Sequence, residues 1–417
     1  MIRRKLLRFF FATLGFSLFT AFESKTVFAF DLFSKIRKRL SPLSAAEPAI
    51  DRKDAILPEE GQSISVETAL NSRCTGDYDN NPREIHWGMF DKGRKLSTEQ
   101  IEHIRATAII PRFTNANVTI QTEKNILTFT TDNPRTRPHR DWLMVESGMQ
   151  QQAVGLVCAA LGAGYVFNTL GVEGKSLSSH KYATTRIKLE SLKPSYHGAY
   201  WTNEAPTQPS PRASGNLADP VRKGTLPLIT ALAELKTAKG AGKQATTNDL
   251  GQLLWAARGR TPHFSISSPW GMTIPTYNVK EIITNVHVIY GDDLYRYDNG
   301  KPGSPAHTLQ PSGKIAGAIS QQLKDQFKPS DLFIVLSINN NQAKSLWEIG
   351  YQLLNLLLQA HSLNIAYKAI LLNEDQKQTI RNAGIKEPVA VLCITRNWLK
   401  SKEASHSKLS FTGQNSL

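Results

Sequence analysis

The residues whose side chains are best suited to bind a ligand or take part in a reaction lie in the second half of the 417-residue chain. Two ammonium groups flank a hydroxyl at Lys236, Thr237 and Lys239, directly after an apolar helical run at 228–235. An anionic group requires cations and hydrogen-bond donors of this kind. A solvated lysine pair at the end of a helix has the same sequence, so both interpretations stay open at this point.

A loop further along the chain offers a different chemistry. Ser267 and Ser268 carry hydroxyls that can serve polar ligand atoms, and Gly271 lets the backbone approach a ligand closely. Trp270 lies beside them and either stacks on a planar ring or fills the pocket as a packed side chain. An ordinary turn is the alternative for the whole segment.

Other chemistries find little support in the sequence. The cysteines Cys74, Cys158 and Cys393 have no metal-ligand spacing, and no Gly-x-Ser-x-Gly motif suggests a hydrolase. Cys158 and Cys393 lie in apolar patterns, which predict buried, unreactive thiols. The net charge is +15, but residues 1–40 hold nine basic against two acidic side chains and contribute +7 of it. This distribution does not favour a nucleic-acid partner, which requires basic residues on the folded domain.

The first residues are typical of an export signal. A basic start at 1–8 precedes an uncharged apolar run at 9–22, and compact residues follow at 27–29. Fourteen apolar residues are short for a membrane-spanning helix, so we expect a cleaved signal, with a retained anchor as the alternative. Arg3 and Arg4 resemble a twin-arginine signal, a route that carries folded proteins with their cofactors. We expect an exported protein of the periplasm or cell envelope, with transient membrane association through this segment.

An internal repeat organises the rest of the chain. Two long, apolar helical segments, at 145–165 and 347–367, are each predicted to form a buried central helix. Six positions recur between them at an offset of 202 residues: Glu146 and Glu348, Gly148 and Gly350, Gln150 and Gln352, Leu156 and Leu358, Leu161 and Leu363, and Tyr165 and Tyr367. A repeat at a fixed offset is the signature of a duplicated unit.

Shorter matches upstream support the repeat. The stretch 68–70 recurs as 230–232, and the stretch 96–108 resembles 245–257, each of which predicts an N-cap followed by an amphipathic helix. β-rich runs follow in both copies, and two unrelated α+β domains are the alternative. The expected organisation is a signal peptide at 1–29, a linker at 30–62, a first half at 63–174, a connection at 175–224 with one strand near 185–192, a second half at 225–400 and a tail at 401–417.

Five motifs of the second half resemble, in order, those of the SagB-type dehydrogenases, a branch of the nitroreductase family. They span about residues 225–395: Leu250–Gly259, Ser268–Pro275, Leu294–Asp298, Glu348–Asn355 and Glu387–Leu392. The first copy, at about 63–172, matches less well. The resemblance implies an α+β fold, with a mixed sheet flanked by helices, in a two-fold dimer that binds FMN at its interface. A tandem chain would then be an intramolecular pseudo-dimer with a degenerate first copy.

The resemblance also assigns roles to residues. It places Lys236, Thr237 and Lys239 on the FMN phosphate, and Arg73 at the corresponding place of the first copy, where Gly76 stands instead of a second base. The full set of cofactor-binding candidates is Arg73, Lys236, Thr237, Lys239, Ser267, Ser268, Trp270, Gly271, Glu348, Asn355 and Arg396. Glu348 either contacts the cofactor or neutralises a buried neighbour.

One departure limits the resemblance. Azoline-forming members of the branch carry a Lys-Tyr pair before the central helix, and here Lys344 has no tyrosine partner in the stretch 339–345. The sequence therefore predicts an exported FMN-dependent oxidoreductase that transfers hydride through flavin N5, to or from an unidentified small molecule or peptide. A degenerate copy of the fold that binds or supports other molecules is the alternative. A third hypothesis, a protein that binds anionic polymers, would explain only the net positive charge of the chain.

Overall fold

The computed structural model describes residues 64–73, 95–114, 119–132, 137–167, 175–176, 181–191, 216–262, 270–275, 283–301, 304–328, 330–340 and 343–395. The chain divides into two units, Met1–Ala55 and Ile56–Leu417, and all of these residues belong to the second unit. The expected signal peptide, linker and tail lie outside the described residues, as do Ser267, Ser268, Arg396 and Cys74. None of the described helices is long and apolar enough to cross a membrane.

The first half contains an antiparallel sheet in the order β1-β2-β5-β3, with the short strand β4 paired to β5. Its core includes Leu127, Phe129 and Ile187, which are fully buried. Its elements are α3 (Val66–Ser72), α5 (Thr98–Thr107), β1 (Thr119–Glu123), β2 (Ile126–Asp132), α6 (Arg137–Ala160), β3 (Ala163–Phe167), β4 (Lys175–Ser176) and β5 (Lys181–Ser191). The single strand expected near 185–192 is β5. It lies between β2 and β3 as a full member of the first sheet, whereas the sequence predicted it within a connection.

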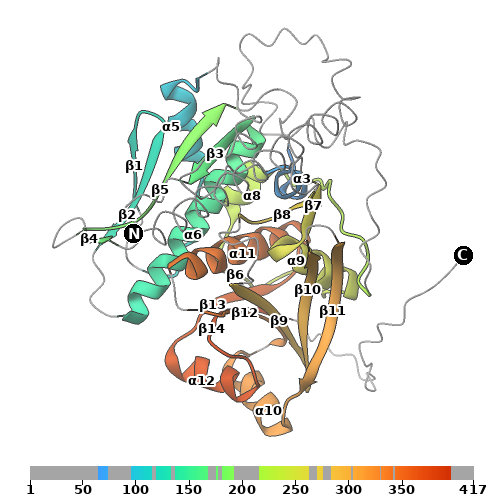
Figure 1. The fold of residues 1–417 in the computed structure, drawn as a ribbon. Coiled ribbons are helices and arrows are strands. Elements are labelled where there is room, and N and C mark those ends of the chain that lie inside the picture. The colour runs from blue at the N-terminus through green and yellow to red at the C-terminus, as the bar shows by residue number, and fades with distance from the viewer. Residues whose placement is uncertain are drawn as a thin grey trace, which may run out of the picture. The chain divides into compact units, whose positions relative to one another are not determined.

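The second half contains a seven-stranded antiparallel sheet in the order β11-β10-β9-β12-β14-β13-β6, and a separate pair of strands, β7 and β8 (Figure 1). Its helices are α8 (Leu228–Glu234), α9 (Thr247–Arg258), α10 (Gly317–Gln326), α11 (Ala343–Ser362) and α12 (Glu374–Asn382). Its strands are β6 (Ala238–Lys239), β7 (Arg260–Pro262), β8 (Trp270–Met272), β9 (Thr284–Tyr290), β10 (Asp293–Lys301), β11 (Ser304–Lys314), β12 (Ser330–Ile338), β13 (Tyr367–Leu371) and β14 (Pro388–Thr395).

Helices cover both faces of the seven-stranded sheet. The central helix α11 packs on one face, against β12, β14 and β9. On the other face α10 and α12 pack together over a smaller apolar cluster that includes Phe327, Phe333 and Ile380. The α+β class predicted from the sequence is therefore confirmed, as helices combined with antiparallel sheets.

The expectation of a mixed sheet needs correction, because the strand pairs of both described sheets are antiparallel. The reason lies in the connection around each central helix. Strands β12 and β13 flank α11 in sequence and run in the same direction, but β14 lies between them, antiparallel to both. In the first half β5 separates β2 from β3 in the same way around α6. The two halves thus share one connectivity.

The helix starts follow from local chemistry. Ser97 and Thr246 each cap a helix through a capping box, in which the cap hydroxyl accepts a backbone N–H three residues on and that residue's side chain accepts the cap's own N–H. In the second box, Asp249 accepts from the Thr246 amide at 2.8 Å and from the Lys243 ammonium at 2.8 Å. The expected N-caps of the two corresponding helices are confirmed, and a box of this kind stabilises a helix end by about 1 kcal/mol.

The two central helices cross in close contact at glycines. A Cβ atom on Gly350 would lie 2.2 Å from the Val145 carbonyl oxygen, and one on Gly148 would lie 2.3 Å from the Trp347 carbonyl oxygen. These contacts are reciprocal, because Gly148 and Gly350 are corresponding positions of the repeat, and so are Val145 and Trp347. Such mutual contacts are typical of an interface with two-fold symmetry.

A second reciprocal contact joins the two short helices at their starts. The Val66 amide donates to the Leu226 carbonyl at 3.1 Å, and the Leu228 amide donates to the Ile64 carbonyl at 2.9 Å. Each donor in one half corresponds to the donor in the other at an offset of 162 residues, the same offset that relates the stretches 68–70 and 230–232. The antiparallel bridge between Ser65 and Pro227 lies between these two hydrogen bonds.

Two smaller expectations are also confirmed. Cys158 lies buried in α6 and Cys393 buried in β14, and both are free thiols. Burial raises the pKa of the Cys158 thiol, and raises that of Cys393 to about 12, so neither is a reactive thiolate near neutral pH. Gly162 adopts a positive φ of 66° just after α6, as is common for the glycine that ends a helix.

Candidate functional site

The lysine-rich segment follows α8 and is held by the edge of the seven-stranded sheet. The Ala369 amide donates to the Thr237 carbonyl at 2.7 Å, and the Tyr367 hydroxyl donates to the Lys236 carbonyl at 3.0 Å. Lys236 is exposed, whereas Thr237 and Lys239 are half-buried. Since the backbone is fixed by β13, the two ammonium groups extend from a rigid base.

Neighbouring residues complete this basic edge. The Lys239 ammonium donates to the Asn364 side-chain oxygen at 2.8 Å. Lys368 on β13 pairs in register with Ala238 on β6 and is exposed, so its side chain lies on the opposite face of the strand pair from that of Lys239. Sequence reasoning did not anticipate this neighbour, because only the fold pairs β6 with β13. The register of a strand pair across about 130 residues of chain has no local signal.

Arg73 lies in a different environment. It follows α3, is 2% exposed, and uses each of its three guanidinium nitrogens on protein oxygens. Nη2 donates to the Met272 carbonyl at 2.8 Å, Nε donates to the Thr273 carbonyl at 3.2 Å, and Nη1 donates to the Tyr165 hydroxyl at 3.4 Å. Arg73 thus ties the first half to the segment that follows β8 in the second half.

The same segment is held from the central helices. Besides Arg73, the Thr273 carbonyl accepts from the amide of Gln152 on α6 at 3.0 Å and from the amide of Asn355 on α11 at 3.2 Å. Gln152 also donates to the Asn355 side-chain oxygen at 2.9 Å, and Asn355 donates to the Ala256 carbonyl at 2.9 Å. The backbone of Trp270 and Gly271, which pairs with β7, therefore leads directly into an anchored segment.

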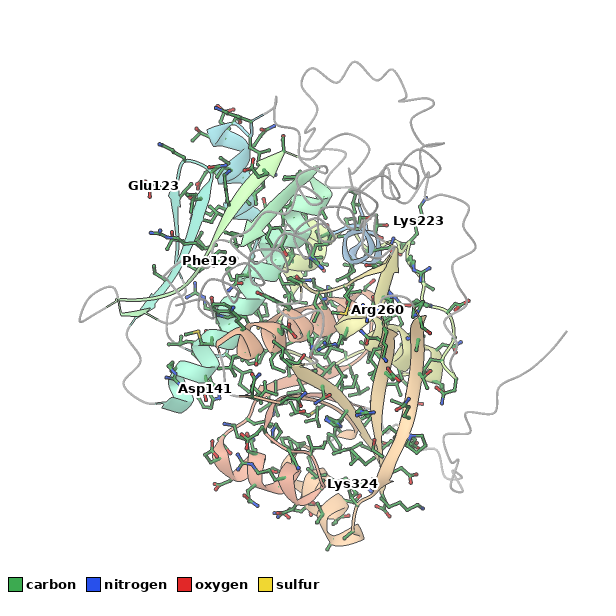
Figure 2. All side chains as sticks on the ribbon, viewed as in Figure 1. Glu123, Phe129, Asp141, Lys223, Arg260 and Lys324 are labelled. Carbon is green, nitrogen blue, oxygen red and sulfur yellow. The ribbon has the colours of Figure 1, made fainter. Side chains whose placement is uncertain are left out.

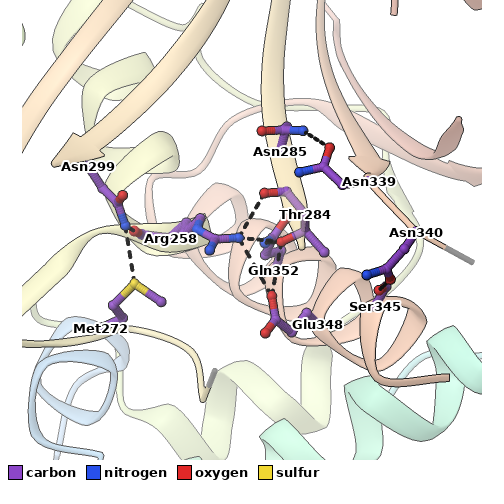
Figure 3. A network of polar contacts seen from close by, with 10 residues as sticks. All are labelled: Arg258, Met272, Thr284, Asn285, Asn299, Asn339, Asn340, Ser345, Glu348 and Gln352. Atoms are coloured by element: carbon purple, nitrogen blue, oxygen red, sulfur yellow. Dashed lines mark hydrogen bonds and ion pairs between the residues drawn. The ribbon is translucent and has the colours of Figure 1, made fainter. Parts of the chain in front are cut away.

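Glu348 belongs to a third group, a buried ion pair with Arg258 (Figure 3). The two charged groups are 3.6 Å apart, with side-chain exposures of 1% and 8%. The Thr284 hydroxyl donates to the Glu348 carboxylate at 3.1 Å, and Arg258 donates to the Thr284 carbonyl at 2.9 Å. Burial lowers the pKa of Arg258, and the charge of Glu348 opposes that shift. Of the two roles open to Glu348 in the sequence, these contacts fit the neutralisation of a buried neighbour.

Glu146, the corresponding residue of α6, has a parallel role in the first half. Its carboxylate accepts from the Phe113 amide at 2.5 Å, from the Thr114 amide at 2.7 Å and from the Thr114 hydroxyl at 2.6 Å. Burial raises the pKa of Glu146, and these hydrogen bonds and Arg112 lower it in part. Each central helix therefore uses its glutamate to hold the chain at or just beyond the end of the capped helix in its own half.

Arg260 shows how the short strand β7 is fixed beside these groups. Its guanidinium, labelled in Figure 2, donates to the Asn299 carbonyl at 3.2 Å and to the Gly300 carbonyl at 2.7 Å, both on β10. Burial lowers its pKa to about 10, so it stays charged near neutral pH. The side-chain amide of Asn299 in turn donates to the Arg258 carbonyl at 2.7 Å.

The structure thus divides the described candidates into three groups: the lysines on the β6–β13 edge, Arg73 and Asn355 around Met272 and Thr273, and Glu348 with Arg258. Only the first group offers side chains whose chemistry fits the phosphate of FMN, namely two ammonium groups and a hydroxyl on a fixed backbone. Arg73 instead donates from each of its three guanidinium nitrogens to a carbonyl or hydroxyl oxygen of the protein. Across the described ranges, no three His, Cys, Asp or Glu side chains cluster as metal ligands.

Comparison with known proteins gives similarity only at the level of solved structures. No family model matches the sequence, and no curated protein sequence matches it. Six chains of known structure match, among them two that are each described as a "putative nitroreductase". The one from Ralstonia eutropha JMP134 is 24% identical, with 46% of this chain and 90% of that chain covered and a TM-score of 0.35. The one from Anabaena variabilis ATCC 29413 is 11% identical, with 65% and 69% covered and a TM-score of 0.44. These values do not assign the chain to a family.

Proposed function

We propose that this chain is an exported FMN-dependent oxidoreductase of the nitroreductase family, built as an intramolecular pseudo-dimer of two tandem halves. The observation that carries the proposal is the pair of reciprocal contacts between the halves, at Gly148 and Gly350 and at Val66 and Leu228. They support a two-fold relation within one polypeptide, of the kind that the resemblance to SagB-type dehydrogenases implies. The substrate is a small molecule or a peptide.

Bound FMN would supply the redox chemistry by accepting or donating a hydride at N5. The protein's part is to bind and orient. Lys236, Thr237 and Lys239 would hold the phosphate, and the hydrogen bonds from Tyr367 and Ala369 keep their backbone in place before the ligand arrives. A preorganised site of this kind binds more tightly, because less conformational entropy is lost on binding.

By the resemblance, the segment around Trp270 and Gly271 would contact the ring and the ribityl chain, and the end of that segment, at Thr273, lies beside Arg73. Its rigidity comes from the hydrogen bonds that converge on the Thr273 carbonyl. Because this backbone is anchored on both central helices, it is held against the small displacements that would misorient a substrate. Glu348 would act through Arg258, by fixing the end of α9 next to this segment.

A second candidate function is a binding or structural protein that retains the fold without the chemistry. Protein contacts occupy Arg73, Glu348 and Asn355, which favours this alternative, since those positions then serve stability. Uptake of FMN separates the two candidates, because the second has no need of a cofactor.

Substitution of the basic edge tests the first candidate. Lys236→Gln and Lys239→Gln should each weaken FMN binding by about tenfold or more, because a hydrogen bond to a charged group contributes about 1.5–3 kcal/mol. Quenching of FMN fluorescence during titration measures the dissociation constant. Lys301→Gln, at an exposed lysine on β10, is the matched control and should leave the constant unchanged. Equal affinities in all three variants would contradict the assignment of the phosphate to this edge.

A further inference from the structure

Arg260, on the short strand β7, is held in place by backbone groups on several sides. Its carbonyl accepts from the indole N–H of Trp255 at 3.1 Å, and its Cα lies opposite that of Met272 in the pair of β7 with β8. Its guanidinium donates through Nε to the Asn299 carbonyl at 3.2 Å and through Nη2 to the Gly300 carbonyl at 2.7 Å. Both the backbone and the side chain of Arg260 are therefore positioned before any ligand arrives.

These contacts leave one edge of the Arg260 guanidinium available. Of its N–H donors, the carbonyls of β10 take one on Nε and one on Nη2. The remaining donors, on Nη1 and Nη2, form no hydrogen bond with a described residue. Together they present parallel N–H groups, which is the arrangement that binds both oxygens of a carboxylate.

The positive charge of Arg260 forms no ion pair with a carboxylate of the described residues. Glu348 lies 3.6 Å from Arg258, and the two oxygens of Asp298 accept from a backbone amide and a side-chain amide at 2.8 Å each. Arg260 is half-buried. Burial lowers its pKa, and the charge of Arg258 lowers it further, while Asp298 opposes part of the shift. Surroundings that disfavour a positive charge in this way favour the binding of an anion beside it.

The other two arginines near this strand pair are already engaged within the protein. Arg73 is 2% exposed and donates from each of its three guanidinium nitrogens to a protein oxygen. Arg258 is 7% exposed and is paired with a carboxylate. Arg260 thus combines an available edge with a place opposite Met272, the residue directly after the segment that the resemblance assigns to the flavin ring.

We propose that Arg260 binds a carboxylate of the substrate, so that the substrate is an anionic small molecule or peptide. The proposal rests on the proposed function, because only that function makes the neighbouring segment part of a redox site. Arg260 would be a binding residue that orients one end of the substrate, since a guanidinium edge holds a carboxylate in one plane and a point charge does not. Fixing one end in this way lowers the entropy that orientation against the flavin would otherwise cost.

Benzoate and benzamide test the proposal, because they have nearly the same shape and differ in charge. Isothermal titration calorimetry of the full chain saturated with FMN should show that benzoate binds about tenfold more tightly than benzamide, or better. Equal affinities, or no measurable binding of benzoate, would overturn the proposal while leaving the proposed function intact. A chain that takes up no FMN would instead overturn the proposed function, so the two failures are distinguishable.

Two variants assign the carboxylate to Arg260. Arg260→Gln should remove the preference for benzoate, and Arg260→Lys should keep only part of it, because an ammonium lacks the parallel N–H groups. The matched control is Arg296→Gln, at an exposed arginine on β10, which should leave both affinities unchanged. A preference for benzoate that survives Arg260→Gln would overturn the proposal. So would a loss of FMN affinity of about tenfold in that variant, since the edge would then bind the flavin phosphate.

Chemical modification of the parent chain decides the question if Arg260→Gln does not fold. Phenylglyoxal reacts with accessible guanidinium groups, so it should modify Arg260 and spare the buried Arg73 and Arg258, as mapped by mass spectrometry of peptides. Benzoate should protect Arg260 from modification, and benzamide should not. An Arg260 that resists phenylglyoxal, or that is modified equally in the presence of benzoate, would overturn the proposal.

Discussion

Replacing Gly350 with alanine is expected to lower the free energy of unfolding by about 3 kcal/mol or more, although alanine is the better helix former. Helix propensity alone would favour alanine by about 1 kcal/mol. The added Cβ, however, would lie 2.2 Å from the Val145 carbonyl oxygen, a backbone atom of α6 that cannot rotate away. The central helices would have to separate, and overpacking of this kind typically costs about 1–3 kcal/mol and at times more.

Unfolding in urea, followed by circular dichroism, measures the effect. Gly317→Ala is the matched control, because a Cβ at Gly317 in α10 would meet nothing within 4 Å. It should leave the midpoint unchanged or raise it slightly. The corresponding substitution Gly148→Ala should destabilise the protein as Gly350→Ala does, since its Cβ would meet the Trp347 backbone. A Gly350→Ala protein as stable as the parent would contradict the close crossing of α6 and α11.

Replacing Glu348 with leucine is the second change with a large expected effect. It would leave the Arg258 guanidinium buried without its counter-charge, and removing one partner of a buried ion pair costs about 3–5 kcal/mol. The double variant Glu348→Leu/Arg258→Met should recover a large part of that loss, because neither side chain then carries an unpaired charge. A double-mutant cycle on urea midpoints measures the coupling between the two residues.

The exposed pair of Lys314 and Asp293 provides the control for this cycle. Its charged groups are 3.8 Å apart, with side-chain exposures of 81% and 42%. Asp293→Asn should therefore change the midpoint only slightly, since solvent screens such pairs. If the effects of the Glu348 and Arg258 substitutions simply add, the two side chains are not coupled, and the ion pair does not neutralise Arg258 as described.

The sequence predicts well those features of the fold that are encoded locally. The long segments predicted as central helices become α6 and α11, and their side chains are buried even where they are polar, as at Gln151 and Gln359. Ser97 and Thr246 predict the starts of their helices, because each capping residue and its partner are only three positions apart. The repeat was visible because Glu146, Gly148 and their counterparts keep their spacing in the chain.

The features that depend on distant contacts could not be predicted in this way. From the sequence, Arg73 was predicted to bind phosphate. Only the fold brings Met272 and Thr273, about 200 residues away, into contact with it. The partner of Glu348 is likewise set by the packing of α9 on α11. The sheets are antiparallel because β5 lies between β2 and β3, and β14 lies between β12 and β13. No sequence pattern within β5 or β14 encodes which strands they pair with.

The measurement that tests the account most directly is the visible absorption spectrum of the purified chain, with the released flavin identified by chromatography. The account predicts the absorption spectrum of a bound flavin, with FMN as the flavin released. A colourless protein that also fails to take up added FMN would contradict the oxidoreductase proposal and would favour the second candidate, a binding or structural role.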